Sequence, residues 1–270
     1  SAIGADTLRA ADTMLVCAWA TMHLSSPTAR EVSLKELLSR HADLLMQPNG
    51  LIDALAALNV PTAWISMAQA LYSRAVLSDR IKEVHFLLSS GEYIQAHDVL
   101  IGVVGPKAVV ERDLDALREV LGGFMESGRE GAKAPYKSVP GWKTGGQVYF
   151  DYVHLLDLQK VGLAAAAAKD KDEVRTLLNR IGAALAAMKT AQNKKVGLAK
   201  GRKAGMARED IVQRAGVWEM GRVVAEAVLR TEEAEAERRE VLRLPLAEDV
   251  VMRVSTELAW GRFGEVMAQN

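Results

Sequence analysis

The stretch that decides the fold is IKEVHFLLSSGEYIQAHDVLIGVV, residues 81–104. Apolar side chains recur in it at spacings of three and four: Ile81, Val84, Leu88, Tyr93, Ala96 and Leu100. That spacing places them on one face of a helix. Gly91 stands between the two halves, and glycine commonly follows the last residue of a helix. The stretch therefore predicts two amphipathic helices joined by a tight turn.

The same periodicity runs through most of the 270 residues. It predicts helices at 7–24, 28–45, 51–58, 62–76, 79–90, 92–104, 112–125, 147–168, 171–192, 207–240 and 247–268. No alternating run is bounded by hairpin signals, and aromatic residues make up only 5% of the chain, so a sheet is not expected. Short links between helices favour antiparallel neighbours. The predicted fold is all-α, an irregular α-solenoid of stacked antiparallel helices forming a single domain over residues 1–270.

Two segments interrupt the pattern. Residues 127–146 are rich in glycine and proline, and residues 194–208 carry six Lys or Arg and no acid, with three glycines between them. Glycine at that density disfavours a helix, so flexible loops are expected near 127–146 and 194–206. Within the second predicted helix, Ser33 and Glu36 have the spacing of a capping box, which predicts a helix start.

Charge and cysteine content exclude several classes of protein. Lys and Arg total 34 and Asp and Glu total 34, which disfavours a general nucleic-acid binder. The single cysteine, Cys17, excludes an intramolecular disulfide and a cysteine-cluster zinc site. Its apolar neighbours predict a buried, inert thiol. The most apolar stretch, Met14–Leu24, is too short to cross a bilayer, which needs about 20 residues.

No motif points to catalysis. The histidines show no metal-binding spacing, and packing or capping roles are expected for His85 and His97. The glycine-rich segment Gly141–Gly146 lacks the spacing and the preceding strand of a phosphate-binding loop. Carboxylate pairs such as Asp113 and Asp115 lie near predicted helix starts, where acids complement the helix dipole. The sequence therefore predicts no catalytic, cofactor-binding or metal-binding residue and no enzyme.

The predicted terminal helix carries two apolar stripes, although a helix at the end of a stack needs one to anchor it. An apolar stripe left in water usually marks an interface. Four residues are therefore expected to bind a partner: Met252, Ala259, Phe263 and Val266. The alternative is that the preceding long helix, through Val217 and Met220, folds back and covers both stripes.

Several segments, taken in order, are familiar from one family. The stretch Leu34–Leu45 is followed by Val60–Trp64, Ala70–Arg74, Lys82–Gly91 and Ala96–Leu100. Later come Leu244–Leu246 and a glycine-containing segment with the residues Trp142, Gly145, Gly146, Val148, Tyr149, Asp151 and Tyr152. Their order and spacing resemble the helical tail of the nucleoporin 96 family, known in fungi as the nucleoporin 145 C-fragment. The resemblance extends from about Met14 to Val266.

The resemblance implies a structural scaffold component of the nuclear pore complex, in its Y-shaped coat subcomplex, at the nuclear envelope of the nucleus. It implies support of mRNA and protein transport through protein contacts. Implied partners are the long-arm nucleoporin of the 120 or 160 type and the short-arm nucleoporin of the 85 type. It also implies the tail of an ancestral-coatomer-element scaffold, whose propeller partner binds only an amino-terminal part missing from this chain.

Two other interpretations stay open. A helical-repeat adaptor of a vesicle coat would show the same periodicities. An RNA-binding helical protein would use the basic residues 194–208, because phosphate contacts need only Lys or Arg on a flexible segment. That segment has no aromatic residues for base stacking, so nucleic acid is the less favoured partner. No small-molecule substrate is expected.

Overall fold

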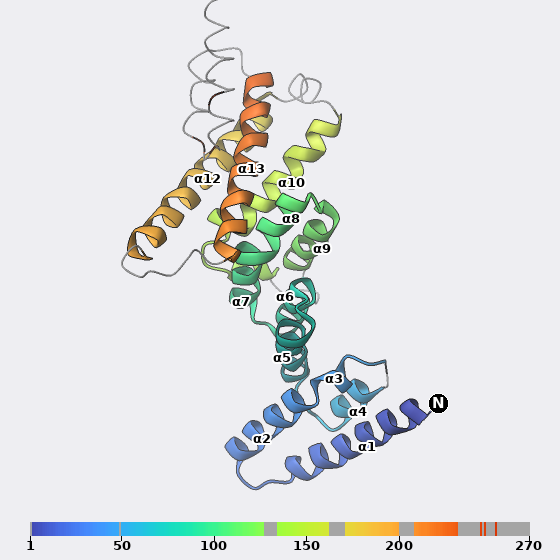
Figure 1. Cartoon of the computed structure of the whole chain (residues 1–270). Coiled ribbons are helices and arrows are strands. Elements are labelled where there is room, and N and C mark those ends of the chain that lie inside the picture. Colours follow the sequence, from blue (N-terminus) through green and yellow to red (C-terminus); the bar gives the residue numbers. More distant parts are fainter. Residues whose placement is uncertain are drawn as a thin grey trace, which may run out of the picture. The chain divides into compact units, whose positions relative to one another are not determined.

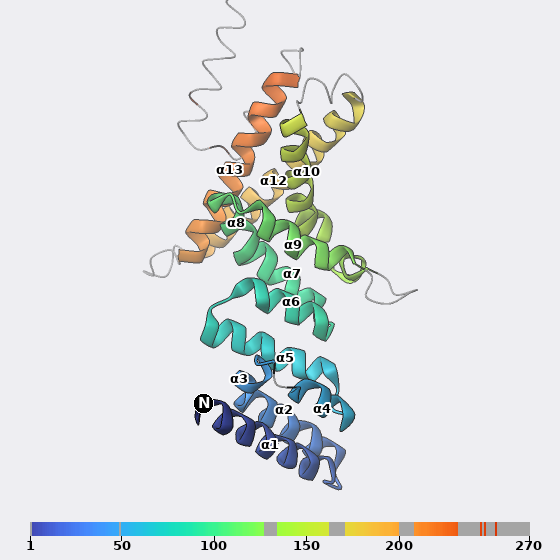
Figure 2. The same ribbon diagram turned by 90° about the vertical axis from the view of Figure 1, so that its right-hand side faces the viewer.

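The computed structural model describes residues 2–48, 50–126, 134–161, 171–199 and 208–231, together with Leu244, Leu246 and Met252. Within these residues every regular element is a helix, and successive helices pack antiparallel (Figures 1 and 2), which confirms the predicted all-α fold. The chain divides into two compact units. Unit 1 is Ser1–Val99 with Gly123–Val139, and unit 2 is Leu100–Gly122 with Pro140–Asn270. The single domain over 1–270 stays a prediction.

Unit 1 follows the predicted helices closely. Its elements are α1 (Ala2–Met22), α2 (Pro27–Arg40), α3 (Ala42–Leu45), α4 (Leu51–Ala57), α5 (Thr62–Tyr72), the π-helix η1 (Ser73–Leu77), α6 (Arg80–Ser90), α7 (Tyr93–Val99) and the 3-10 helix η3 (Pro135–Ser138). Gly91 follows α6 with a φ of +84°, a conformation that suits glycine. The predicted turn between the two deciding helices is therefore present.

The predicted helix start at Ser33 is wrong. Ser33 lies inside α2, which begins six residues earlier at Pro27. The true cap is Ser26, whose Oγ accepts a hydrogen bond from the backbone N–H of Ala29 at 3.3 Å. Proline in the first turn lacks only an N–H that would have no helical partner, so Pro27 favours this start. The capping-box spacing of Ser33 and Glu36 is coincidental.

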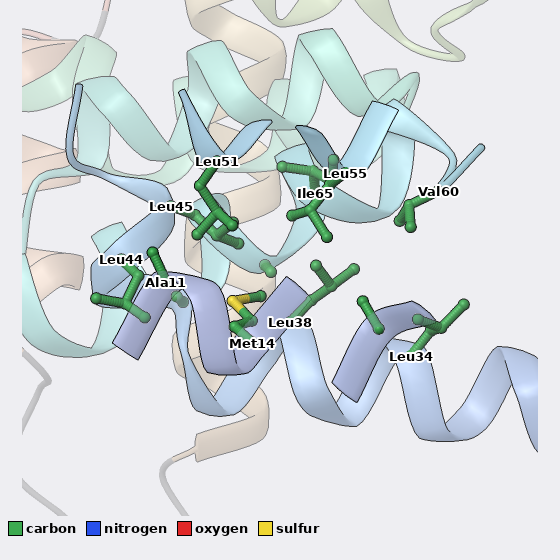
Figure 3. Close-up of a cluster of buried hydrophobic side chains, with 13 residues drawn as sticks. Ala11, Met14, Leu34, Leu38, Leu44, Leu45, Leu51, Leu55, Val60 and Ile65 are labelled. Atoms are coloured by element: carbon green, nitrogen blue, oxygen red, sulfur yellow. The ribbon is translucent and has the colours of Figure 1, made fainter. Parts of the chain in front are cut away.

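The core of unit 1 joins α1 to α5. Figure 3 shows 13 buried apolar side chains that point toward one another between these helices. They are Ala11, Met14, Ala18, Leu34, Leu38, Ala42, Leu44, Leu45, Leu51, Leu55, Val60, Ile65 and Ala68. One buried polar group lies beside them: the Gln69 side-chain amide donates to the carbonyl of Leu45 at 2.8 Å. That bond satisfies a carbonyl at the end of α3, which has no helical partner of its own.

Unit 2 combines short elements with the two longest helices that the structure describes, α12 (Lys171–Ala199) and α13 (Arg208–Thr231). Its elements are the π-helix η2 (Leu100–Val104), α8 (Gly105–Glu111), the larger part of α9 (Leu114–Met125), the 3-10 helix η4 (Trp142–Thr144), α10 (Gly146–Val161), α12 and α13. The sequence analysis did not predict α8, since it placed no helix between residues 104 and 112. Pro106 lies in the first turn of α8, where proline is tolerated. None of the helices described here is long and apolar enough to cross a membrane.

The two segments expected to be loops differ from that expectation where the structure describes them. Residues 134–146 form η3 and η4, and bury Pro135, Val139 and Trp142. Residues 194–199 continue α12, because only one of the three glycines of the basic segment, Gly197, falls within them. Residues 127–133 and 200–207 lie outside the described part of the chain, as does most of the helix expected at 247–268.

The segment Trp142–Tyr152 connects the elements of unit 2. Trp142 Nε1 donates to Gln147 Oε1 at 3.2 Å, and Gln147 Nε2 donates to Asp151 Oδ1 at 2.8 Å. Arg180 of α12 closes the network, with its Nε 2.5 Å from Asp151 Oδ2 and its Nη2 2.6 Å from Oδ1. The hydrogen bond to the Asp151 carboxylate raises the pKa of the Arg180 guanidinium. Asp151 is 1% exposed, and its charge is thus paired, as buried charges require.

A substitution in the core of unit 1 should show how much that core contributes to the free energy of unfolding. Replacing the fully buried Leu38 by alanine should lower the free energy of unfolding by about 2–5 kcal/mol, because it leaves a cavity among the 13 side chains. The matched control is Val32→Ala on the same helix, where the side chain is 60% exposed. Its effect should stay within about 0.5 kcal/mol. Urea unfolding followed by circular dichroism measures both, and equal midpoints for the two variants would contradict this account of the core.

A second substitution tests the packing around Trp142. A Cβ atom at Gly146 would overlap the Trp142 ring, which is itself buried. Gly146→Ala should therefore destabilise the chain by about 1–3 kcal/mol through overpacking. Gly122→Ala is the control, because nothing lies within 4 Å of a Cβ there. That change in α9 should raise stability by about 0.5–1 kcal/mol, since alanine favours helix over glycine. Thermal unfolding of both variants measures these changes in stability. Stabilisation by Gly146→Ala would contradict the close packing described around Trp142.

Candidate protein-interaction site

The partner-binding residues predicted at the carboxyl end fall mostly outside the described part of the chain. Met252 is described and is 66% exposed, whereas Ala259, Phe263 and Val266 are not described. Val217 and Met220 of α13, the helix considered as an alternative cover, are buried. The interface at these four residues stays a prediction.

The histidines differ in burial, and packing or capping roles were expected for two of them, His85 and His97. His97 on α7 is buried, and burial lowers its pKa, with Asp98 acting in the opposite direction. His23 and His41 are exposed. Among the residues that the structure describes, no group of three or more His, Cys, Asp or Glu side chains has the geometry to hold a metal ion.

Charged side chains of α13 form a cluster in unit 2. Arg222 donates to Glu219 and, at 2.7 Å, to Glu226, and Arg112 lies 3.6 Å from Glu219. The hydrogen bond from Arg222 holds the pKa of Glu219 below its usual value. Tyr152 lies within the field of this cluster, and burial together with the Glu219 charge raises its pKa to about 12. These ion pairs connect neighbouring side chains of the fold.

The prediction for Cys17 is wrong. Its thiol is exposed, although Val16 and Ala18 on either side are apolar. The reason is helical geometry: α1 buries Ala11, Met14 and Ala18 on one face, and Cys17 lies about 100° from Ala18 around the helix axis. Apolar neighbours in the sequence point in other directions on a helix, so they do not predict burial.

The clearest candidate site is an apolar groove between α1 and α4, both in unit 1. Its lining comes from Leu15, Val16 and Trp19 of α1 and from Ala54, Ala57 and Leu58 at α4. The groove has a volume of about 360 Å³. Val16 is 64% exposed and Trp19 55%, which is unusual for large apolar side chains that lie side by side. The groove can bind apolar groups, and it offers no titratable group for chemistry.

The Trp19 side chain is held in place on the rim of this groove. The ring of His23 lies against the indole, with the ring centroids 4.4 Å apart. His23 Nδ1 is itself 2.8 Å from the carbonyl oxygen of Trp19. An anchor that is already ordered loses less conformational entropy when a partner binds.

Sequence reasoning missed this site. Leu8, Leu15 and Trp19 share one side of α1 at spacings of seven and four, and no interface was predicted from them. In the structure a neighbouring side of α1, with Met14 and Ala18, is the one buried in the core, and Leu15 lies between the two sides and packs against that core. A helix with apolar residues on two sides was the available signal.

The comparisons with known proteins agree on one family. The family model Nup96, described as "Nuclear protein 96", matches residues 5–72. This segment contains α2 to α5, most of α1, and every residue that lines the groove. The sequence resemblance to the nucleoporin 96 family is therefore confirmed by a match in the part of the chain that holds the candidate site.

Individual relatives extend the similarity to about half of the chain. Nucleoporin nup189 of Schizosaccharomyces pombe is 30% identical over 153 residues, 57% of this chain and 8% of the relative. Nucleoporin NUP145 of Chaetomium thermophilum is 29% identical over 151 residues, 55% of this chain and 8% of the relative. The Nup98-Nup96 protein of Drosophila melanogaster is 23% identical over 140 residues, 50% of this chain and 7% of the relative. The chain thus spans only a small part of the length of these relatives.

Residues 5–72 thus match the Nup96 family model, and about half of the chain is distantly homologous to nucleoporins that are similar to it.

Proposed function

We propose that this chain is a structural component of the nuclear pore complex, located at the nuclear envelope, and that it acts through protein–protein contacts rather than catalysis. The observation that carries the proposal is the match of residues 5–72 to the Nup96 family, together with relatives that are nucleoporins. An antiparallel stack of amphipathic helices supports it, since such stacks present long side surfaces to other proteins.

The finer proposal is a scaffold role in the Y-shaped coat subcomplex. Its partners would be the long-arm nucleoporin of the 120 or 160 type and the short-arm nucleoporin of the 85 type. The propeller partner of the family is not proposed as a partner of this chain. Support of mRNA and protein transport would then be architectural. The alternative interpretation, an adaptor of a vesicle coat, is less favoured than this proposal, because the matched relatives are nucleoporins.

The test is reconstitution from purified proteins. The full chain should form a complex with the long-arm or the short-arm nucleoporin from the same organism, with a dissociation constant of about 1 μM or below, as is usual for interfaces of standard size. Size-exclusion chromatography with light scattering measures the stoichiometry. Single-stranded RNA at physiological salt serves as the comparison and should bind at least about tenfold more weakly. Tight RNA binding with no nucleoporin complex would favour the RNA-binding alternative.

The carboxyl-terminal stripe gives a separate prediction. Met252→Glu combined with Phe263→Glu should weaken nucleoporin binding by about tenfold or more, because a charge replaces two apolar anchors. The thermal transition measured by circular dichroism is the control and should not move. Unfolding of the double variant, or unchanged binding, would mean that these residues belong to the chain's own core.

A further inference from the structure

We propose that the α1–α4 groove binds one amphipathic helix of a protein partner, and that this helix carries Lys or Arg beside its apolar face. The proposal rests on the proposed function as a scaffold of protein contacts, and it specifies where and what the chain binds. The groove lies entirely within unit 1 and within the segment matched by the family model.

The groove favours a helix over an extended peptide because its walls offer no backbone hydrogen bonds. Both walls are helices whose backbone groups are already paired. The N–H of Leu58 donates to the carbonyl of Ala54 at 3.1 Å, and the N–H of Ala54 donates to that of Gly50. An extended peptide in this apolar groove would leave its own N–H and C=O groups unpaired, at a substantial cost in free energy. A helix satisfies them internally.

The shape of the groove also suits a helix. Ala54 and Ala57 lie one helical turn apart and carry the smallest side chains in the lining. Small residues allow another helix to approach closely. Val16 and Trp19, which are also one turn apart, form the higher wall on α1. An apolar partner side chain would enter above the alanines and contact the indole, which is the kind of aromatic anchor that dominates many interfaces.

The length of the apolar stripe sets the size of the partner. Leu8, 60% exposed, extends the stripe along α1 beyond the groove itself. From Leu8 to Trp19 the helix rises about 17 Å, at 1.5 Å per residue. A partner helix of about three turns covers that distance, with anchors at positions i, i+4, i+7 and i+11.

The charges around the stripe indicate basic residues on the partner. Asp12 lies in the stripe one turn before Val16, and Asp53 lies one turn before Ala57 on the outer side of α4. Neither carboxylate has an ion-pair partner within the described part of the chain. The two helices together carry three acids and one basic residue, Arg9. Complementary charge on a partner helix would steer its approach and fix its direction.

The first experiment uses two synthetic three-turn peptides and the full chain. Both peptides have leucine at the four anchor positions; one has lysine at the flanking positions and the other has glutamate. Cys17 is the sole cysteine, is exposed and does not line the groove, so a fluorophore there reports binding by anisotropy. The wild-type chain should bind the lysine peptide at least about tenfold more tightly than the glutamate peptide.

Matched variants assign the binding to the groove. Val16→Asn removes an apolar wall residue and Ala57→Trp fills the floor; each should weaken lysine-peptide binding by about tenfold. Val32→Asn is the control, because Val32 is a valine of similar exposure, 60%, outside the groove; it should bind as the wild type does. Asp12→Asn with Asp53→Asn should abolish the preference for lysine. Equal loss with Val32→Asn, or binding that the groove variants leave unchanged, would overturn the proposal.

The same variants, tested with the purified nucleoporins, separate this inference from the proposed function. If the wild-type chain binds a nucleoporin and Val16→Asn and Ala57→Trp bind it equally well, the groove proposal fails and the scaffold function stands. If the chain binds no nucleoporin, the scaffold function fails and the peptide result still decides the groove. A wild-type dimer in light scattering that Val16→Asn dissociates would identify a second copy of the chain as the occupant and would overturn the proposal.

Discussion

The structure of unit 1 depends on hydrophobic burial in one core cluster, which includes Met14, Leu38 and Leu55. These side chains exclude water from one another, and their contacts hold the helices that carry them in place. Each of the helices α1 to α5 contributes to this one cluster (Figure 3). Hydrophobic burial is worth about 25 cal/mol per Å² of apolar area, and isolated helices of seven or eleven residues are not stable alone. α4 and α5 therefore exist as helices because the core requires them.

The groove follows from the same constraint. α1 turns its Met14 and Ala18 side toward the core, which leaves its second apolar side, with Val16 and Trp19, in water. α4 is only seven residues long, and its alanines beside α1 are too small to cover that side. A helix that needs one apolar side for folding and carries two has the second available for a partner. This is the physical link between the fold and a role in protein assembly.

Unit 2 shows why a family resemblance can be specific and yet say little about partners. Trp142, Gly146 and Asp151 belong to the segment that carries much of the resemblance, and all three serve the interior. Trp142 lies so close to Gly146 that a Cβ atom has no room, and Asp151 connects α10 to Arg180 of α12. Such residues preserve the packing of a family. The groove in unit 1, by contrast, is lined by side chains with no distinctive motif.

Helix content, helix order and the turn at Gly91 were determined by the sequence itself, because periodicity, proline and glycine act through local geometry. Local geometry did not decide that residues 135–138 and 142–144 form short helices that bury Pro135 and Trp142. Tertiary packing decided the formation of these short helices. It also decided that Cys17 and Trp19 are exposed. A helix with apolar residues on two sides can bury either one, and only its neighbours in space determine which side faces the core and which is left to bind.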